Sequence, residues 1–270
     1  MITSDSHMHT RFSTDSDADI RDMIESALKK GLQSICITDH IDKDYPFHED
    51  TGVEAFLVDL DEYFPKLAEW KEAYAEKIQI RRGIELGLQP HLAGFYEELT
   101  NQYPFDFVIF SCHQVENQEF CRQQVQKGKT QREYNRRYYQ EILDVAKIYK
   151  NYSILGHLDV VKRYDLKGEI AFDEIRDLIE EIFEVIIADG KGIELNTSSF
   201  AYQLKSLMPS REILELYYDM GGRIITIGSD AHNADRIGDH IKESEEILKE
   251  IGFGGIYTFD RMEPRFHSFS

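Results

Sequence analysis

The sequence predicts an α/β fold in which parallel strands form a barrel. Short apolar runs alternate with segments of helical periodicity almost from end to end. This order occurs seven times, which is typical of βαβ units and a parallel sheet. A chain of 270 residues is long enough for one large core, and single α/β barrels commonly have this length. We therefore expect residues 1–270 to form one domain and favour a closed barrel over an open doubly wound sheet, although the number of units alone does not decide closure.

The predicted strands are short runs rich in apolar and β-branched residues. They lie at residues 2–6, 34–38, 78–86, 105–111, 153–156, 192–195 and 223–227. The tail, residues 257–270, is predicted as an eighth strand with a closing segment. In an alternative interpretation it brings Arg261 or Arg265 towards a functional site.

The predicted helices carry apolar residues at a spacing of three or four positions. They lie at residues 17–30, 53–77 and 172–188, and a fourth opens at Pro209-Ser210 and closes at Gly221-Gly222. Two connections, residues 41–52 and 114–129, are long for this fold. Long loops at one end of a barrel usually cover a site.

Charge and composition narrow the class of partner. The formal net charge of −19 repels nucleic acid phosphates, so we expect no nucleic-acid partner. A small anionic substrate remains compatible with this charge, because bound divalent cations can reverse the field locally. The three cysteines have no paired spacing, and the chain shows neither a signal peptide nor an apolar run of membrane-spanning length. We therefore expect a cytoplasmic protein with no membrane partner; the oligomeric state cannot be predicted.

Potential metal ligands follow nearly every predicted strand. They are His7, His9 and Asp15 after the first strand, His40 after the second, Glu85 in the third, His113 after the fourth, His157 after the fifth, and Asp230 and His232 after the seventh. Taken singly, each has a structural explanation, such as a helix cap, a salt-bridge partner or a buried core histidine. Structural residues have no reason to gather at the same end of every strand, whereas a metal centre at a barrel mouth requires it. The sequence therefore predicts a metal site.

The number and type of these donors indicate several ions. One open metal site needs three or four protein ligands, so nine donors suit two or three divalent ions, with one carboxylate bridging. Imidazole and carboxylate ligands without thiolate pairs suit zinc, manganese, iron or cobalt. Clustered divalent ions favour phosphoryl chemistry, because they neutralise phosphate oxygens and activate a bound water.

The motifs H7-M-H9, D15, T38-D-H40, G83-I-E85, S111-C-H113, G156-H-L-D159 and G228-S-D-A-H232 resemble those of the polymerase and histidinol phosphatase (PHP) superfamily. The resemblance implies a distorted (β/α)7 barrel of the TIM-like type with parallel strands and a trinuclear centre. It implies one ion held by His7, His9, Glu85 and Asp230, a second by Glu85, His113 and His157, and a third by Asp15, His40 and His232. Asp5 and Asp39 would orient the ligating imidazoles, or would simply be solvated loop acids.

Within the superfamily, H157-L-D-V-V-K-R-Y164 and E194-L-N-T-S198 resemble the monofunctional L-histidinol-phosphate phosphatases of histidine biosynthesis. The resemblance implies a phosphoric monoester hydrolase that converts L-histidinol phosphate to L-histidinol and phosphate through a multinuclear metal centre and a bridging hydroxide. The chain departs from the family in one place. Relatives often read NTSG with an arginine nearby, whereas N196-T-S-S-F-A-Y202 has no basic residue before Lys205.

We assign Glu85, Asp230 and Arg163 to catalysis and Arg163, Lys162 and Asn196 to substrate binding. Arg163 is the candidate for a bidentate phosphate clamp, with a surface ion pair as the alternative and Arg11 as a weaker candidate. The proton donor is unassigned, although His48 is one candidate. Acids that could bind the cationic groups of the substrate are Glu116, Glu119 and Asp159. Ser198 and Ser199 are turn or cap residues in this interpretation, since no histidine accompanies them as a base.

Two rival interpretations remain. A PHP phosphoesterase could act on nucleotides or nucleic acid ends, but the charge and the lack of a basic, aromatic groove disfavour it. A non-catalytic metal-binding or regulatory barrel is disfavoured by the open positions that nine ligands leave, since structural metal sites are normally closed.

Overall fold

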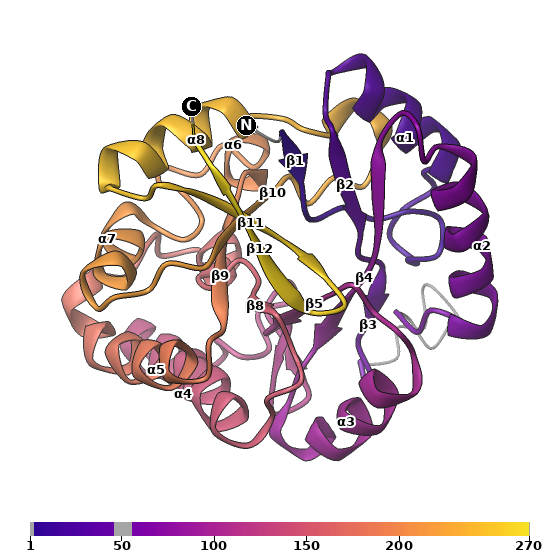
Figure 1. Cartoon of the computed structure of the whole chain (residues 1–270). Helices are drawn as coiled ribbons and strands as arrows, with labels where there is room; N and C mark the ends of the chain where they lie inside the picture. Colours follow the sequence, from indigo (N-terminus) through magenta and orange to yellow (C-terminus); the bar gives the residue numbers. More distant parts are fainter. Residues whose placement is uncertain (1–2, 46–55, 270) are drawn as a thin grey trace.

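The fold is a barrel of parallel strands surrounded by helices (Figure 1), as seen in a computed structural model that describes residues 3–45 and 56–269. The strands of the barrel follow the order β1-β2-β4-β5-β8-β9-β10, and every pair in this order is parallel. They span Ser4–Asp5, Ser34–Ile37, Gln79–Gly87, Phe107–Ser111, Ile154–Leu155, Gly192–Asn196 and Ile225–Gly228. The short strand β3 (His40–Ile41) pairs with β4 in the same register as β2. The prediction of a distorted, seven-stranded parallel barrel is confirmed.

Backbone hydrogen bonds between the first and last strands close the barrel. The Ser6 N–H donates to the Ile227 carbonyl at 3.0 Å, and the Asp230 N–H donates to the His7 carbonyl at 2.8 Å. Further along, the His9 N–H donates to the Ala231 carbonyl at 2.8 Å. The segment after β1 is therefore fixed beside the segment after β10.

The helices in the described part of the chain are α1 (Ile20–Lys29), α2 (Leu60–Ala73), α3 (Ala93–Gln102), α4 (Gln131–Ile148), α5 (Arg176–Ala188), α6 (Ser198–Ala201), α7 (Arg211–Asp219) and α8 (Ile241–Ile251). Helices were predicted at α1, α2, α5 and α7, whereas α3, α4, α6 and α8 were not predicted. Short 3-10 turns lie at Pro90–Leu92, Val160–Tyr164, Phe172–Glu174 and Ala234–Arg236. The helix predicted at 53–77 is shorter than expected, because Asp59 caps it by accepting the N–H groups of Asp61 and Glu62.

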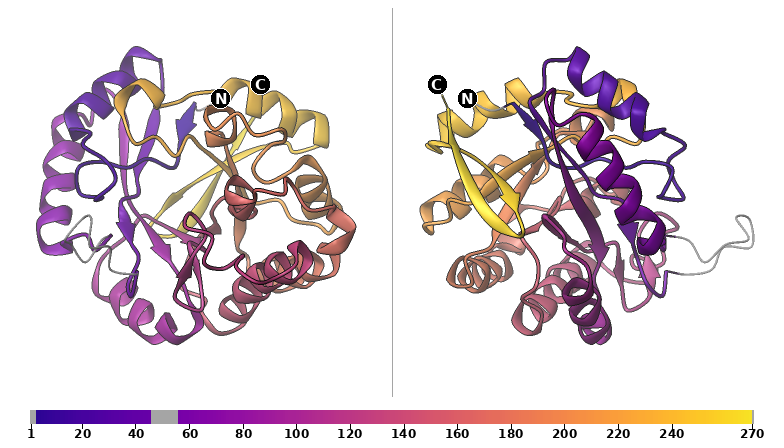
Figure 2. Two further views of the ribbon diagram at one scale, coloured as in Figure 1. Left: turned by 180° about the vertical axis from the view of Figure 1, so that it is seen from behind. Right: turned by 45° about the vertical axis from the view of Figure 1, so that its right-hand side comes forward.

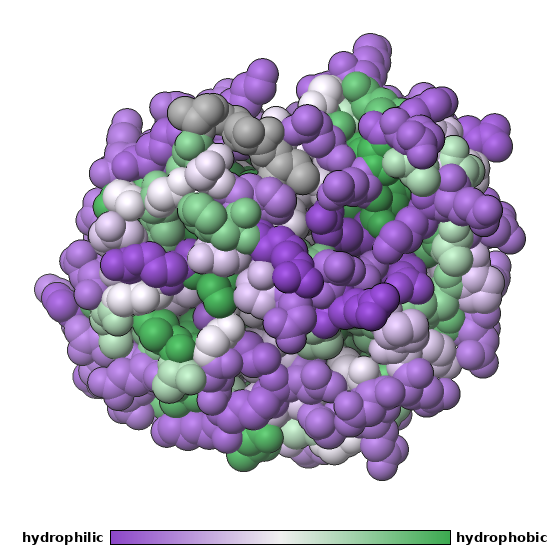
Figure 3. All heavy atoms as spheres, in the orientation of Figure 1, coloured by the Kyte–Doolittle hydropathy of each residue, from purple (hydrophilic) through white to green (hydrophobic). Residues whose placement is uncertain are grey.

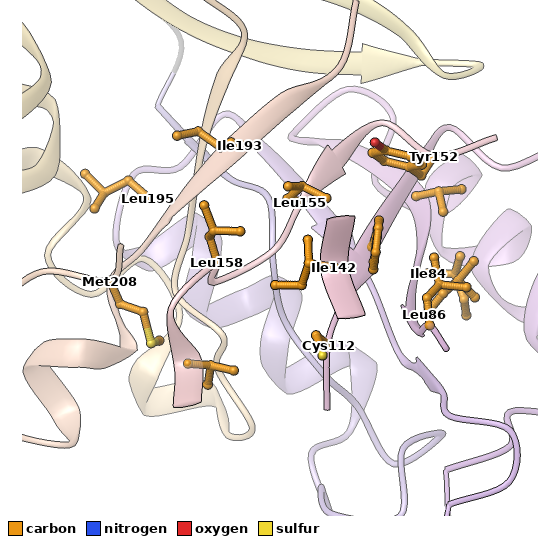
Figure 4. Packing of buried hydrophobic residues seen from close by; sticks show 14 of the residues in the cluster. Ile84, Leu86, Cys112, Ile142, Tyr152, Leu155, Leu158, Ile193, Leu195 and Met208 are labelled. Atoms are coloured by element: carbon orange, nitrogen blue, oxygen red, sulfur yellow. The ribbon is translucent and has the colours of Figure 1, made fainter. Parts of the chain in front are cut away.

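The alternation of side chains along the strands separates the core from the barrel interior. On β9, Ile193 and Leu195 pack in the main hydrophobic cluster, part of which is shown in Figure 4, whereas Glu194 contacts His7 across the barrel. On β4, Ile84 and Leu86 belong to the same cluster, and Glu85 between them faces the interior. The core therefore lies between the sheet and the helices, and polar side chains occupy the barrel interior near the carboxyl ends of the strands.

The tail forms an antiparallel hairpin of β11 (Gly255–Asp260) and β12 (Glu263–Ser268) that is separate from the barrel sheet. The prediction of an eighth strand is therefore wrong, because β10 already pairs back to the segment after β1. The hairpin lies across the end where the strands begin (Figure 2): Phe259 contacts Phe107, the first residue of β5, and the Met262 N–H donates to the Asp106 carbonyl. Arg261 and Arg265 thus lie on the end opposite to the predicted ligands. Figure 3 shows that this face is largely hydrophilic.

The two long connections differ from simple loops. Residues 114–129 contain a small hairpin of β6 (Gln114–Val115) and β7 (Gln118–Glu119). The first connection begins at Ile41, the second residue of β3, and its residues 46–52 lie outside the described part of the chain. In the described part of the chain, none of the helices is both long and apolar enough to cross a membrane.

Candidate metal centre

The carboxyl ends of the barrel strands bring the predicted metal ligands together. Within the described residues, four overlapping sets of three donors have their ligand atoms within 4.8 Å of one another. These sets are His7, His9 and Asp230; His7, Glu85 and His157; His9, His40 and His232; and His40, Asp42 and His113. Eight of the nine predicted ligands thus belong to these sets, and the ninth, Asp15, lies beside His232.

The first group surrounds the Nε2 atom of His7. This atom lies 3.1 Å from the Nε2 atom of His9 and 3.1 Å from the Oε2 atom of Glu85. The Oδ1 atom of Asp230 lies 3.3 Å from His9 Nε2 and 3.7 Å from His7 Nε2. Asp230 has a φ of 53°, a left-handed conformation that is costly for a residue with a side chain and recurs at functional sites. Its backbone bond to His7 holds it there.

The second group shares Glu85 with the first. The Oε1 atom of Glu85 lies 2.9 Å from His157 Nε2 and 3.3 Å from His113 Nε2, and the two imidazole nitrogens are 3.4 Å apart. Because Oε2 faces the first group and Oε1 the second, this carboxylate has the position of a bridging ligand.

The third group lies nearest to solvent. The Oδ2 atom of Asp15 lies 3.0 Å from His232 Nε2 and 3.6 Å from His40 Nε2. The His9 ring stacks against both of these imidazoles, with centroid distances of 4.2 Å to His40 and 4.3 Å to His232. The Asp15 side chain is 36% exposed, whereas that of His7 is fully buried. His40 also lies 3.2 Å from Glu85 Oε2, and its ring centroid lies 5.2 Å from that of His113, so the third group adjoins the other two.

The donors fit divalent cations. The Oε2 atom of Glu85 is buried and has no hydrogen-bond partner among the described residues, although imidazole nitrogens of His7, His9 and His40 lie 3.1 to 3.4 Å away. A buried carboxylate oxygen without a partner costs free energy, and a cation would satisfy it. A set of imidazoles and carboxylates suits zinc, manganese or iron.

The charges in the donor cluster also favour the binding of divalent cations. Burial alone would raise the pKa of Glu85, but His7, His40 and His113 outweigh it and hold this pKa well below its ordinary value. Burial alone would lower the pKa of His40, but Glu85, Asp15 and Asp42 raise it to about 9. The acids thus stabilise positive charge on this imidazole, and a bound cation would displace the proton.

Glu194 on β9 is a site residue that the sequence prediction missed. Its Oε1 atom lies 2.8 Å from His7 Nδ1, and its Oε2 atom accepts the His157 N–H at 3.0 Å. A carboxylate on the remote nitrogen of a ligating imidazole fixes the orientation and tautomer of the ring. The available signal was an acid at an interior position of the apolar run G192-I-E-L-N196.

Asp42 was also missed. Its Oδ2 atom lies 2.7 Å from His113 Nδ1. Gly87, at the end of β4, leaves room for it, because a Cβ at that position would lie 2.3 Å from Asp42 Oδ1. In the sequence Asp42 looks like an ordinary loop acid, and no local signal separates it from its neighbours.

Asp5 and Asp39 support the histidines without contacting an imidazole directly. Asp5 accepts the N–H groups of Ser229 at 2.9 Å and Gly238 at 2.8 Å, and thereby ties β1 to the loop after β10. Asp39 accepts the Ser13 hydroxyl at 2.7 Å, and that hydroxyl oxygen lies 3.4 Å from His9 Nδ1. Asp39 therefore reaches an imidazole through Ser13, while Asp5 holds the chain around His7.

Arg163 is the only lysine or arginine among the described residues that line the hollow over the donors. Its Nη2 atom donates to Ser198 Oγ at 2.7 Å and lies 3.5 Å from Asp230 Oδ2. The side chain is 11% exposed, so the guanidinium is held mostly within the protein. Tyr45, Phe56, Tyr164 and Tyr202 contribute aromatic surface to the same hollow.

The other two predicted substrate-binding residues lie elsewhere. Lys162 donates to Asp159 at 2.8 Å and to Ser206 at 2.7 Å, and it lines a different hollow. Asn196 is fully buried, and its amide bonds within the protein to Glu194 and Ser198. Neither side chain is placed to reach a molecule above the donors.

The remaining candidates for contacts with the substrate do not gather at the donor cluster. Arg11 lies near Asp19 on the surface, and Glu116 pairs with Arg137. Glu119 is buried behind the hollow, where it accepts the hydroxyl of Tyr45 at 2.9 Å. Asp159 accepts the N–H of Ser210, away from the donors. His48 lies outside the described residues.

Comparisons with known proteins agree with this geometry. The model of the PHP domain family matches residues 5–198. A histidinol-phosphatase of Lactococcus lactis is 32% identical over 96% of this chain and 95% of its own length. A protein of Clostridium acetobutylicum named "Probable histidinol-phosphatase" is 30% identical over 96% of this chain and 97% of its own.

A solved structure agrees with the fold. It is the crystal structure of histidinol phosphate phosphatase from Lactococcus lactis complexed with zinc, L-histidinol and phosphate. It is 30% identical, has a TM-score of 0.88 and covers 97% of this chain and 98% of its own. The chain therefore belongs to the PHP domain family, in the branch that contains the histidinol-phosphatases.

Proposed function

We propose that this protein is a phosphoric monoester hydrolase that converts L-histidinol phosphate to L-histidinol and phosphate. The observation that carries the proposal is the shared position of Glu85 between groups of imidazole and carboxylate donors, in a chain similar over nearly its full length to a protein solved with zinc, L-histidinol and phosphate. We further propose that it serves histidine biosynthesis in the cytoplasm, as the family resemblance implies.

The donors would hold two or three divalent ions. His7, His9, Glu85 and Asp230 would hold one, Glu85, His113 and His157 a second, and Asp15, His40 and His232 a third. When bound, such ions would neutralise phosphate oxygens and lower the pKa of a coordinated water.

The chain itself would orient the substrate. Arg163 would bind the phosphoryl group, since its guanidinium lies at the edge of the donor cluster, beside Asp230. The apolar wall of Tyr45, Phe56 and Tyr164 would exclude water from the rest of the hollow and pack against the organic part of the substrate.

A substrate panel tests the proposal. Zinc- and manganese-loaded protein is assayed for phosphate release from L-histidinol phosphate, nucleoside monophosphates and a single-stranded oligonucleotide. We expect L-histidinol phosphate to have the highest kcat/KM by orders of magnitude. A preference for nucleotides would overturn the proposal in favour of a nucleotide phosphoesterase, and no turnover of any ester by fully loaded protein would indicate a non-catalytic barrel.

A further inference from the structure

The guanidinium of Arg163 is held from two sides by one short segment after β9. Ser198, the first residue of α6, accepts a hydrogen bond from Arg163 Nη2 at 2.7 Å. The ring of Tyr202, the residue that ends this helix, lies with its centroid 3.9 Å from the guanidinium carbon. The Tyr202 N–H donates to the Ser198 carbonyl at 2.9 Å, so the two residues are one helical turn apart and face the same side.

Asn196 sets the direction of the Ser198 hydroxyl. Its Oδ1 atom accepts the Ser198 N–H at 3.0 Å and the Ser198 hydroxyl at 2.5 Å. Asp230 Oδ2 also lies near this hydroxyl, but farther away, at 3.3 Å. A hydroxyl group has one proton, so once that proton goes to the nearer Asn196 the oxygen is left to accept from Arg163. The Asn196 amide group donates in turn to Glu194 Oε2 at 3.0 Å, and this fixes the orientation of the amide.

Both of the polar contacts described for the guanidinium, with Ser198 and with Asp230, are made by its Nη2 atom. The Nε atom of Arg163 is buried and has no hydrogen-bond partner in the described part of the chain. Because Arg163 is the only lysine or arginine lining the hollow among the described residues, its orientation decides whether a phosphoryl group finds a fork of N–H donors there.

We propose that Ser198 and Tyr202 are positioning residues that fix the guanidinium of Arg163 for phosphate binding, with Asn196 orienting Ser198. This inference rests on the proposed function, in which Arg163 binds the phosphoryl group of the substrate. It also gives a role to the run N196-T-S-S-F-A-Y202, which has no basic residue of its own. In this proposal the Tyr202 ring and the Ser198 hydroxyl hold the guanidinium of Arg163 in one orientation.

The experiment compares variants of the zinc-loaded protein. The dissociation constant of inorganic phosphate is measured by calorimetry, KM and kcat are measured with L-histidinol phosphate, and zinc content is measured for each variant. Tyr202→Ala and Ser198→Ala are expected to weaken phosphate binding and raise KM about three- to tenfold, with unchanged zinc content. Tyr202→Phe keeps the ring and is expected to match the wild type.

Two neighbouring variants serve as matched controls. Phe200 stacks on His240 rather than on Arg163, so Phe200→Ala is expected to leave phosphate affinity unchanged. Ser199→Ala removes an adjacent buried hydroxyl and has the same expectation. In an Arg163→Ala background, Tyr202→Ala is expected to have no further effect, because its action passes through the arginine.

Equal phosphate affinity in Tyr202→Ala and Phe200→Ala would overturn the inference. A full Tyr202→Ala effect in the absence of Arg163 would overturn it as well. Failure of the proposed function looks different: the wild type would then bind phosphate, with the same dependence on Arg163, Ser198 and Tyr202, but would not hydrolyse L-histidinol phosphate.

Discussion

The Nδ1 atom of His7 lies 2.8 Å from the Oε1 atom of Glu194, although 187 positions separate the two residues in the sequence. Both side chains are fully buried. The other oxygen of Glu194 accepts the backbone N–H of His157, so one carboxylate holds a histidine from each of two donor groups. This contact links β9, which carries none of the predicted metal ligands, to the centre of the site.

Replacing Glu194 tests its effect on metal affinity. In Glu194→Gln only one of the two carboxylate oxygens remains as an acceptor. The side chain can then no longer accept from both His7 and the His157 N–H, and we expect the His7 ring to lose its fixed orientation. Loss of such a partner typically weakens metal binding about 10- to 100-fold, and we expect that range in competition with a zinc chelator. Glu245→Gln, which changes a buried acid on α8, is the control and should retain wild-type affinity. Identical zinc affinities in the two variants would show that Glu194 has no such role.

Replacing Gly87 tests whether the position of the Asp42 carboxylate matters for metal binding. A methyl group at position 87 would lie 2.3 Å from Asp42 Oδ1 and would displace the carboxylate from His113. We expect Gly87→Ala to lower the zinc content by about one ion per chain and to reduce kcat. In the control Gly94→Ala the new Cβ meets no atom within 4 Å, and the site should be unchanged. Full zinc content in Gly87→Ala would contradict the proposed second ion position.

Arg163→Ala removes the proposed phosphate clamp. We expect kcat/KM for L-histidinol phosphate to fall about ten- to a thousandfold, because a charged donor to the phosphoryl group is lost. Arg163→Lys should recover only part of this, since a lysine cannot form the planar fork. Arg11→Ala, at the surface arginine beside Asp19, is the control. Wild-type turnover and substrate affinity in Arg163→Ala would remove the assignment.

Asp106, at the opposite end of the barrel, gives a pH-dependent prediction for stability. Burial would raise its pKa, but the Arg82 N–H and the charges of Lys71 and Arg82 outweigh this and lower it. An acid with a lowered pKa in the folded protein stabilises the folded state. This contribution to the free energy of unfolding is complete above the pKa of the unfolded chain, about 3.9, and is lost as the pH falls through the lower pKa of the folded state. We expect Asp106→Asn to lower the free energy of unfolding by about 1–3 kcal/mol at pH 7.

Urea unfolding at several pH values measures this difference. The gap between wild type and Asp106→Asn should narrow as the pH falls below about 4. Asp173→Asn, at an exposed acid, should show little difference at any pH. A gap that stays constant down to pH 3 would mean that the charge of Asp106 contributes nothing.

Much of the fold could be predicted because its signals are local. Buried parallel strands give short apolar runs, and helices give apolar residues at a spacing of three or four, as in α5, where Leu178, Ile179, Ile182, Phe183 and Ile186 are all buried as expected. The tail was mispredicted because its turn carries no recognisable signal. Arg261 and Met262 occupy the left-handed positions of a two-residue hairpin turn, with φ of 51° and 62°, where glycine or asparagine is usual.

The site could be predicted only as far as its residue types and strand positions allowed. Imidazoles and carboxylates at strand ends are visible in the sequence, whereas the contacts of Glu194 with His7 and of Asp42 with His113 arise across the barrel. The distinction between Lys162 and Arg163 also needs the structure. They are neighbours in a 3-10 turn with three residues per turn, so their side chains point in different directions, and only Arg163 faces the donors.

Anomalous diffraction from crystals of the zinc-loaded protein tests the central claim most directly. We predict strong peaks on both sides of Glu85, one among His7, His9 and Asp230 and one between His113 and His157, with a third beside Asp15, His40 and His232 when that position is filled. A fully zinc-treated crystal with no peak within bonding distance of Glu85 would contradict the account.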